Sequence, residues 1–89
     1  MKYTVLWIPR AEEQLAAAWM EAPNRNAASR AANAIDVNLG HDPADRGESR
    51  PAGRRILLVA PLGVLFHVEP EDRIARVLNC WRYDRPRLS

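Results

Sequence analysis

The pattern of apolar and polar residues predicts a strand and two helices in the first half of the chain. Residues 2–8 are rich in β-branched and aromatic side chains, which favour a strand, and the run stops at Pro9, which suits the first turn of a helix. Apolar side chains then recur at helical spacing as far as Met20. After a short break, Asn24 can cap a second helix with its own apolar stripe, which Gly40 ends. We therefore predict an N-terminal strand followed by a helical hairpin.

The second half of the chain predicts a loop and then three strands. Residues 41–53 contain several glycine and proline steps and no apolar period, which indicates a long loop. Three apolar runs follow, and the segments between them have the composition of turns. These runs are Arg55–Ala60, Gly63–Glu69 and Arg73–Tyr83. Because turns join consecutive runs, we predict a three-stranded antiparallel meander.

Alternation within the middle run predicts which face of the sheet is buried, because successive side chains of a strand point to opposite faces. The face expected to contact the helices carries Val64, Phe66 and Val68. The opposite face carries Leu65, His67 and Glu69. The predicted fold class is therefore α+β: an N-terminal strand, a helical hairpin and a three-stranded antiparallel meander, with a single layer of helices on one sheet.

Length and composition fit one small globular domain comprising residues 1–89. Of the 89 residues, 47% are hydrophobic and 27% are charged, which excludes a disordered or fibrous chain. The longest apolar stretch, residues 56–66, is broken by Pro61 and Gly63 and is shorter than the roughly 20 residues of a membrane span. One cysteine and no visible secretory signal favour the cytoplasm. A domain this small, without disulfides, is expected to gain stability from an oligomer or a bound partner.

The distribution of charge indicates an anionic partner. The net charge is only +2, but the charge is unevenly distributed. Residues 73–89 carry five arginines and only one acidic residue, Asp84. All but Lys2 of the 13 basic residues are arginine, whose planar guanidinium binds phosphate or carboxylate at two points. The alternative is that these arginines are solvated surface charges.

The residues that bind metals or act as nucleophiles do not form a recognisable motif. Cys80, His41 and His67 are far apart in the sequence and lack the short spacings of a zinc site, so no metal or other cofactor is expected. Cys80 lies in an apolar run, where a lone cysteine is most often a small buried hydrophobic residue. The three tryptophans lie at apolar positions and are expected to pack in the core or on the sheet: Trp7, Trp19 and Trp81.

Basic and aromatic residues gather where the meander begins and ends. Arg54 and Arg55 lie where the chain enters the meander, and the residues where it leaves are Arg82, Tyr83, Arg85 and Arg87. Guanidinium groups can hold a phosphate and stabilise charge that develops on it, and a tyrosine can stack on an unpaired base. This set predicts a site for single-stranded nucleic acid; the alternative is solvated charges and a partly buried tyrosine.

His67 and Glu69 form a second candidate pair, because they share one face of the middle strand. A histidine titrates near neutral pH, so the two side chains could act as acid and base. The alternative is a solvent-facing pair on an exposed strand.

The order of these elements and several short motifs resemble the RelE/ParE toxins of type II toxin–antitoxin systems, often called plasmid stabilisation proteins. The resemblance extends along nearly all of the chain. The residues that carry it are Val5–Leu15, Leu39–Pro43, Gly47, Arg54–Leu57, Val64–Val68 and Ile74–Leu78. Each motif is degenerate, and their order and spacing carry the resemblance together.

The resemblance implies a toxin, most directly a RelE-like endoribonuclease that cuts messenger RNA on the ribosome without a metal. In such enzymes the 2′-hydroxyl attacks the neighbouring phosphate, assisted by basic side chains and an aromatic stack. By position, Arg54 or Arg55, Arg82 and Tyr83 match these residues, and His67 is a further candidate. Gly63 lies where ribonucleases of the family commonly carry an arginine. Two alternatives therefore stay open: a ParE-like inhibitor of DNA gyrase without nuclease activity, and a catalytically inactive binding module.

The resemblance also implies a protein partner, the cognate antitoxin encoded beside the toxin. Antitoxins of such pairs typically wrap a disordered, often acidic tail around the toxin, which a basic C-terminus attracts. We expect a segment of the antitoxin to cover residues 82–87. A homodimer or a hetero-oligomer with the antitoxin fits this expectation, and no membrane partner is expected.

Overall fold

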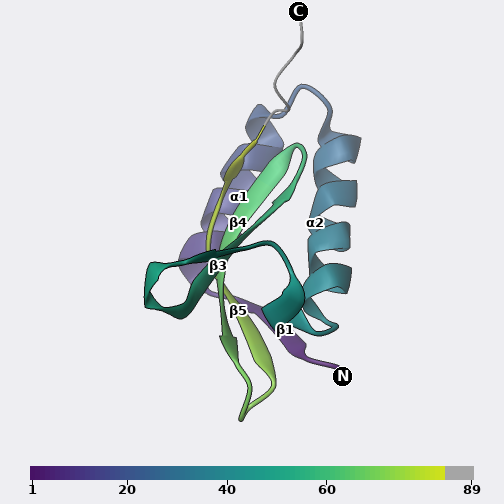
Figure 1. Ribbon diagram of the computed structural model, residues 1–89. Coiled ribbons are helices and arrows are strands. Elements are labelled where there is room, and N and C mark those ends of the chain that lie inside the picture. Colours follow the sequence, from purple (N-terminus) through teal and green to yellow (C-terminus); the bar gives the residue numbers. More distant parts are fainter. Residues whose placement is uncertain (84–89) are drawn as a thin grey trace, which may run out of the picture.

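Two helices pack on one face of a five-stranded sheet in the computed structural model, which describes residues 1–83 (Figure 1). The strands lie in the order β1-β5-β4-β3-β2; β1 pairs with β5 in parallel, and the other neighbours are antiparallel. The elements are β1 (Thr4–Trp7), α1 (Pro9–Glu21), α2 (Arg25–Leu39), β2 (Glu48–Arg50), β3 (Arg54–Val59), β4 (Leu62–Glu69) and β5 (Ile74–Arg82), with short 3-10 turns at Pro43–Asp45 and Pro51–Gly53. This arrangement confirms the predicted α+β class with one layer of helices.

The helices begin where the sequence predicts. Pro9 occupies the first turn of α1, and the side chain of Asn24 caps α2 by accepting a hydrogen bond from the backbone N–H of Ala27 at 3.0 Å. Alanines and two larger aliphatic residues form the buried stripe of α2, which lets the helix lie close to the sheet. These residues are Ala28, Ala31, Ile35 and Leu39.

The buried face of the sheet is the one that alternation predicts. Val64 and Phe66 are fully buried, and Val68 packs against the same core. A β-bulge lies between Leu65 and Phe66: Leu65 pairs with Asn79 and Phe66 with Val77, so β5 carries one extra residue there. Because of the bulge, the buried residues Ala75, Val77 and Cys80 all lie on the core side, although three positions separate the last two.

Three features differ from the prediction. The segment predicted as a loop contains β2, an edge strand whose residues are all exposed and therefore show no apolar alternation. The predicted N-terminal strand is present as β1 and pairs in parallel with β5, so the sheet continues beyond the three-stranded meander at both edges, with β1 at one and β2 at the other. Trp19 is 38% exposed and lies between the helices rather than in the core.

None of the helices within residues 1–83 is long and apolar enough to span a membrane.

Candidate functional site

Four basic side chains form a row across the face of the sheet that is turned away from the helices, which we call the outer face. Arg50 of β2 pairs with Arg54 of β3, Arg54 pairs with His67 of β4, and His67 pairs with Arg76 of β5. Residues directly opposite each other on paired strands have neighbouring side chains on one face. We call Arg50, Arg54, His67 and Arg76 the cationic row.

The members of the cationic row differ in how their charge is neutralised. Arg76 donates two hydrogen bonds to Glu69, from Nε to Oε2 at 2.6 Å and from Nη2 to Oε1 at 3.2 Å. Arg50 pairs with Glu48, with 3.0 Å between Nη2 and Oε2. Arg54 forms no ion pair or hydrogen bond within the part of the chain that the structure describes. Its guanidinium is therefore available to an anion from outside.

His67 lies beside this arginine with its side chain 42% exposed, and its Nε2 is 4.0 Å from Oε2 of Glu69. The hydrogen bond from Arg76 is the main cause that lowers the pKa of Glu69 below its ordinary value. Glu69 is therefore a carboxylate at neutral pH and is a poor proton donor. Within the His67–Glu69 pair that the sequence predicts, this leaves proton transfer to His67 and an electrostatic role to Glu69.

Arg55 has a different environment, although it is the next residue after Arg54. It pairs with Phe66, which places it on the opposite face of β3. Its Nε donates to the carbonyl of Arg46 at 2.7 Å, and its Nη2 donates to the carbonyl of Gly47 at 3.1 Å. Arg55 thus ties the loop before β2 to the sheet and takes no part in the cationic row.

Arg82 and Tyr83 lie at the other end of the sheet. Arg82 pairs with Leu62 of β4 and donates from Nη1 to the carbonyl of Glu21 at 3.3 Å. Tyr83 lies near Pro61, and the backbone N–H of Tyr83 donates a hydrogen bond to the carbonyl of Pro61 at 2.8 Å. His67 lies five positions along β4 from Leu62, which corresponds to about 16 Å. The structure therefore does not gather the candidates around one point, and Arg85 and Arg87 lie outside the described residues.

A second row of residues crosses the same outer face nearer to Arg82. Leu58 pairs with Gly63, and Gly63 pairs with Trp81. We call Leu58, Gly63 and Trp81 the apolar row. A Cβ at Gly63 would lie 2.6 Å from Nε1 of Trp81 and 2.9 Å from Cδ2 of Leu58, so the indole ring covers the glycine. Sequence reasoning assigned no functional role to Trp81; the signal that could have found this contact is a glycine inside a strand, which marks a close approach.

Cys80 of β5 has a structural environment, both at its thiol and at its backbone N–H. Burial raises the pKa of the Cys80 thiol to about 11, which excludes a thiolate nucleophile at neutral pH. The backbone N–H of Cys80, beyond the end of β1, donates to Oε1 of Gln14 at 2.9 Å. Within residues 1–83 no cluster of three histidine, cysteine, aspartate or glutamate side chains could hold a metal ion.

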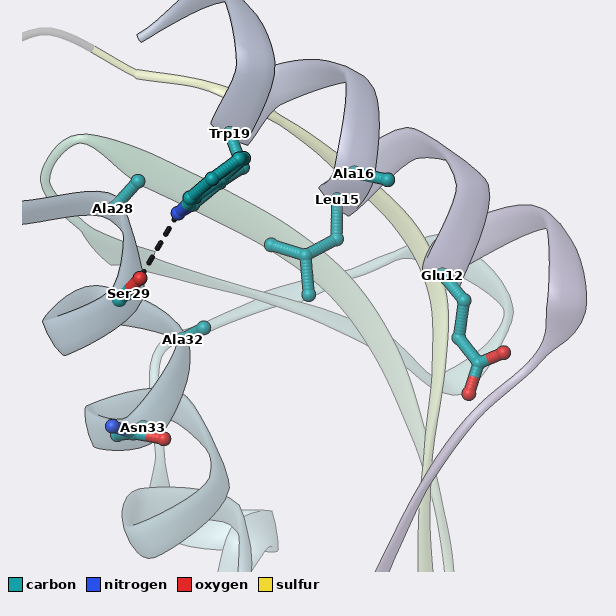
Figure 2. Close-up of a pocket in the computed structure, with 8 residues that line it drawn as sticks. All are labelled: Glu12, Leu15, Ala16, Trp19, Ala28, Ser29, Ala32 and Asn33. Atoms are coloured by element: carbon teal, nitrogen blue, oxygen red, sulfur yellow. Dashed lines mark hydrogen bonds between the residues drawn. The ribbon is translucent and has the colours of Figure 1, made fainter. Parts of the chain in front are cut away.

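A groove lies between α1 and α2, away from the outer face. Figure 2 shows Trp19 reaching from α1 to α2, where its Nε1 donates to Oγ of Ser29 at 3.0 Å, with Leu15 beside it. The guanidinium of Arg25 lies 4.9 Å from the centre of the Trp19 ring. The groove is thus lined by apolar side chains with polar groups at its edges.

Comparisons with known proteins show the fold. Neither the protein-family models nor the curated proteins give a match. Among solved structures, the toxin–antitoxin complex RelBE2 from Mycobacterium tuberculosis matches with a TM-score of 0.71 and 19% identity, covering 94% of this chain and 95% of that chain. A chromosomal ParDE toxin–antitoxin system from P. aeruginosa matches with a TM-score of 0.71 and 17% identity, covering 93% and 98%. The isolated E. coli RelE toxin matches with a TM-score of 0.67 and 11% identity, covering 94% and 87%.

These matches cover nearly all of the chain and include both branches of the family that the sequence resembles. The chain therefore has the fold of the RelE/ParE toxins. At these identities a shared fold does not assign an activity, which depends on the side chains of the site.

Proposed function

We propose that the chain is the toxin of a type II toxin–antitoxin pair and that it cleaves messenger RNA on the ribosome at its cationic row. The observation that supports this proposal is the pairing of Arg54 with His67: a cation without a partner in residues 1–83 lies opposite an exposed histidine. A phosphate bound there would meet both a positive charge and a group that can accept a proton.

The proposed reaction needs no metal ion. Neutral His67 accepts the proton of the ribose 2′-hydroxyl, and the 2′-oxygen forms a bond to the adjacent phosphorus. The bond from phosphorus to the 5′-oxygen of the next nucleotide breaks, and that oxygen takes up a proton from the imidazolium or from water. The products are a 2′,3′-cyclic phosphate and a 5′-hydroxyl. Arg54 stabilises the charge that builds on the phosphate oxygens in the transition state, an effect that is worth several kcal/mol in enzymes.

In the antitoxin complex, we propose that an acidic segment of the partner neutralises the same positive surface. Arg54 offers such a segment an unpaired charge on the outer face, and the predicted contact with residues 82–87 extends the surface beyond the described residues. Binding there would block access of RNA to the cationic row.

A ParE-like inhibitor of DNA gyrase is the second candidate, and the apolar row favours it. Gly63 supplies no charge where family ribonucleases commonly carry an arginine, and the Trp81 indole occupies the adjoining space. Leu58 is 45% exposed beside it. Large apolar residues exposed together on a surface are typical of a protein-binding site, so this part of the outer face could contact a protein target.

Induced expression in a bacterial host tests these alternatives. We would map new 5′ ends by RNA sequencing and measure plasmid supercoiling in the same cultures, for the natural chain, Arg54→Ala and the control Arg30→Ala. Arg30 is an exposed arginine of α2, far from the outer face. Nuclease activity predicts growth arrest with new ends in translated messages, lost in Arg54→Ala and kept in Arg30→Ala. Growth arrest with altered supercoiling and intact RNA would contradict the nuclease proposal and favour an inhibitor of DNA gyrase. The absence of growth arrest would favour an inactive binding module.

A further inference from the structure

Trp81 differs from the other two tryptophans in its hydrogen bonding. The ring N–H of Trp7 donates to Asp36 at 2.8 Å, and that of Trp19 donates to Ser29 at 3.0 Å. The ring N–H of Trp81 has no acceptor among residues 1–83. Among the described residues no buried side-chain nitrogen or oxygen lacks a partner, so this N–H reaches solvent. A donor that the fold leaves unused is available to a ligand.

The position of the Trp81 ring is fixed by its neighbours. Gly63 lies beneath ring atoms Nε1 and Cε2, and Leu58 approaches the same point from β3. Trp81 is half-buried and does not pack against the core residues on the helix side of the sheet. The indole is therefore an aromatic surface held on the outer face, with little side-chain entropy left to lose on binding.

The charge nearby favours nucleic acid over an apolar protein surface as the ligand of this ring. Arg54 and Leu58 lie on the same face of β3, four residues apart, which corresponds to about 13 Å. A strand of RNA lying along β3 and β4 would bring a phosphate to Arg54 and, within a few nucleotides, a base to Trp81. Aromatic side chains on an open sheet face, flanked by cations, bind unpaired bases in this way.

We propose that Trp81 is the residue that positions single-stranded RNA on the outer face, by stacking on an unpaired base that lies a few nucleotides from the cleaved phosphate group. Gly63 makes this possible, because a side chain there would occupy the space of the ring. The free ring N–H of Trp81 donates to an acceptor on the base or its ribose. The inference rests on the proposed function, but it concerns binding, which can be measured without cleavage.

The test measures binding of a short single-stranded RNA whose 2′-hydroxyls are methylated, so that the attacking group is blocked. The RNA carries a fluorophore, and its anisotropy gives the Kd. The variants are Trp81→Ala, Trp81→Phe and the control Trp19→Phe, each checked for folding by circular dichroism. Stacking on one aromatic ring predicts that Trp81→Ala raises the Kd about 5- to 100-fold, that Trp81→Phe raises it less, and that Trp19→Phe leaves it unchanged.

Intrinsic fluorescence provides a second readout that does not depend on Trp81→Ala folding. If a base stacks on Trp81, RNA quenches the natural chain and quenches Trp81→Phe much less. An equal Kd for all variants, or equal quenching of both chains, overturns the proposal. Growth arrest that depends on Trp81 without any change in RNA binding also overturns it, in favour of a protein target.

The two proposals fail separately. If RNA cleavage needs Arg54 but not Trp81, the proposed nuclease function stands and the proposed stacking role of Trp81 is wrong. RNA binding that needs Trp81, without cleavage by the natural chain, removes the nuclease and keeps the stacking role.

Discussion

Arg54 and Arg55 are adjacent in the sequence, yet they lie on opposite faces of β3, and only Arg55 is held by the backbone of a neighbouring loop. Arg54 has no partner within residues 1–83. One arginine is thus free to bind an anion, and the other is part of the structure. Sequence position alone could not distinguish the two roles.

Alanine substitution of each arginine should separate these roles. Arg54→Ala should reduce RNA cleavage about 100-fold or more, because it removes a charge from the transition state, with a change in the free energy of unfolding below about 0.5 kcal/mol. Arg55→Ala should lower the free energy of unfolding by about 1 kcal/mol, because two hydrogen bonds from a partly exposed guanidinium are lost. Urea unfolding and a cleavage assay on the same preparations would show this; the reverse pattern would contradict the assignment.

Gly47 and Gly53 provide a matched pair for the packing of the loop around β2. Both have a positive φ, 65° and 71°, which favours glycine. A Cβ at Gly47 would lie 2.0 Å from the backbone oxygen of Ile56, whereas a Cβ at Gly53 would meet nothing within 4 Å. Gly53→Ala should therefore cost about 1 kcal/mol of unfolding free energy from backbone strain alone. Gly47→Ala should cost about 3 kcal/mol or more, because the clash is with backbone.

Equal losses for these two variants in urea unfolding would mean that the loop does not pack on β3 as described. Hydrogen exchange offers a direct check, because Gly47→Ala should also speed the exchange of amides in β2 and β3, and Gly53→Ala should not.

The contact between Gly63 and Trp81 predicts a strong coupling between the two positions. Gly63→Ala should lower the free energy of unfolding by about 1 to 3 kcal/mol, because the new Cβ displaces the indole and Leu58. In a Trp81→Ala background the same change should be neutral or stabilising, since alanine is preferred to glycine in a strand. A double-mutant cycle should give a coupling above about 1 kcal/mol. A coupling near zero would show that the ring does not cover Gly63.

The sequence predicted the helices and the buried face of β4 because these depend on local periodicity. The faces of β3 were not predictable in this way. The apolar run of β3 is unbroken from residue 56 to residue 59, because the outer face is itself apolar at Leu58. Alternation of apolar and polar residues therefore could not assign Arg54 and Arg55 to faces. β2 was missed because an edge strand with every residue exposed has no apolar pattern.

The candidate site depended even more on register between strands. The cationic row joins residues from four strands, and Arg50 and Arg76 enter it only because β2 and β5 pair as they do. Single-strand patterns placed His67 and Glu69 on one face, but they could not show that Arg76 holds Glu69. Trp81 was expected to pack on the sheet, and its relation to Gly63 follows from pairing across β4 and β5.

The ion pair between Glu69 and Arg76 predicts a dependence of stability on pH. The hydrogen bond from Arg76 lowers the pKa of Glu69 in the folded chain below the ordinary value of 4.5. A carboxyl whose pKa is lower in the folded state binds protons more tightly when unfolded, so it stabilises the fold above pH 4.5. This contribution decreases as the pH falls from 4.5 and is lost below the folded pKa.

Glu69→Gln should therefore be less stable than the natural chain at pH 7, and the difference should vanish as the pH falls below 4.5. Glu71→Gln is the control, because Glu71 is exposed in the turn after β4 and forms no ion pair among residues 1–83, so its substitution removes a charge without breaking a pair. Urea unfolding at a series of pH values would measure both, and added salt should weaken the Glu69 effect, since the pair is partly open to solvent. A Glu69→Gln difference that persists unchanged at pH 3 would mean that the side chain stabilises the hairpin by packing and not by its charge.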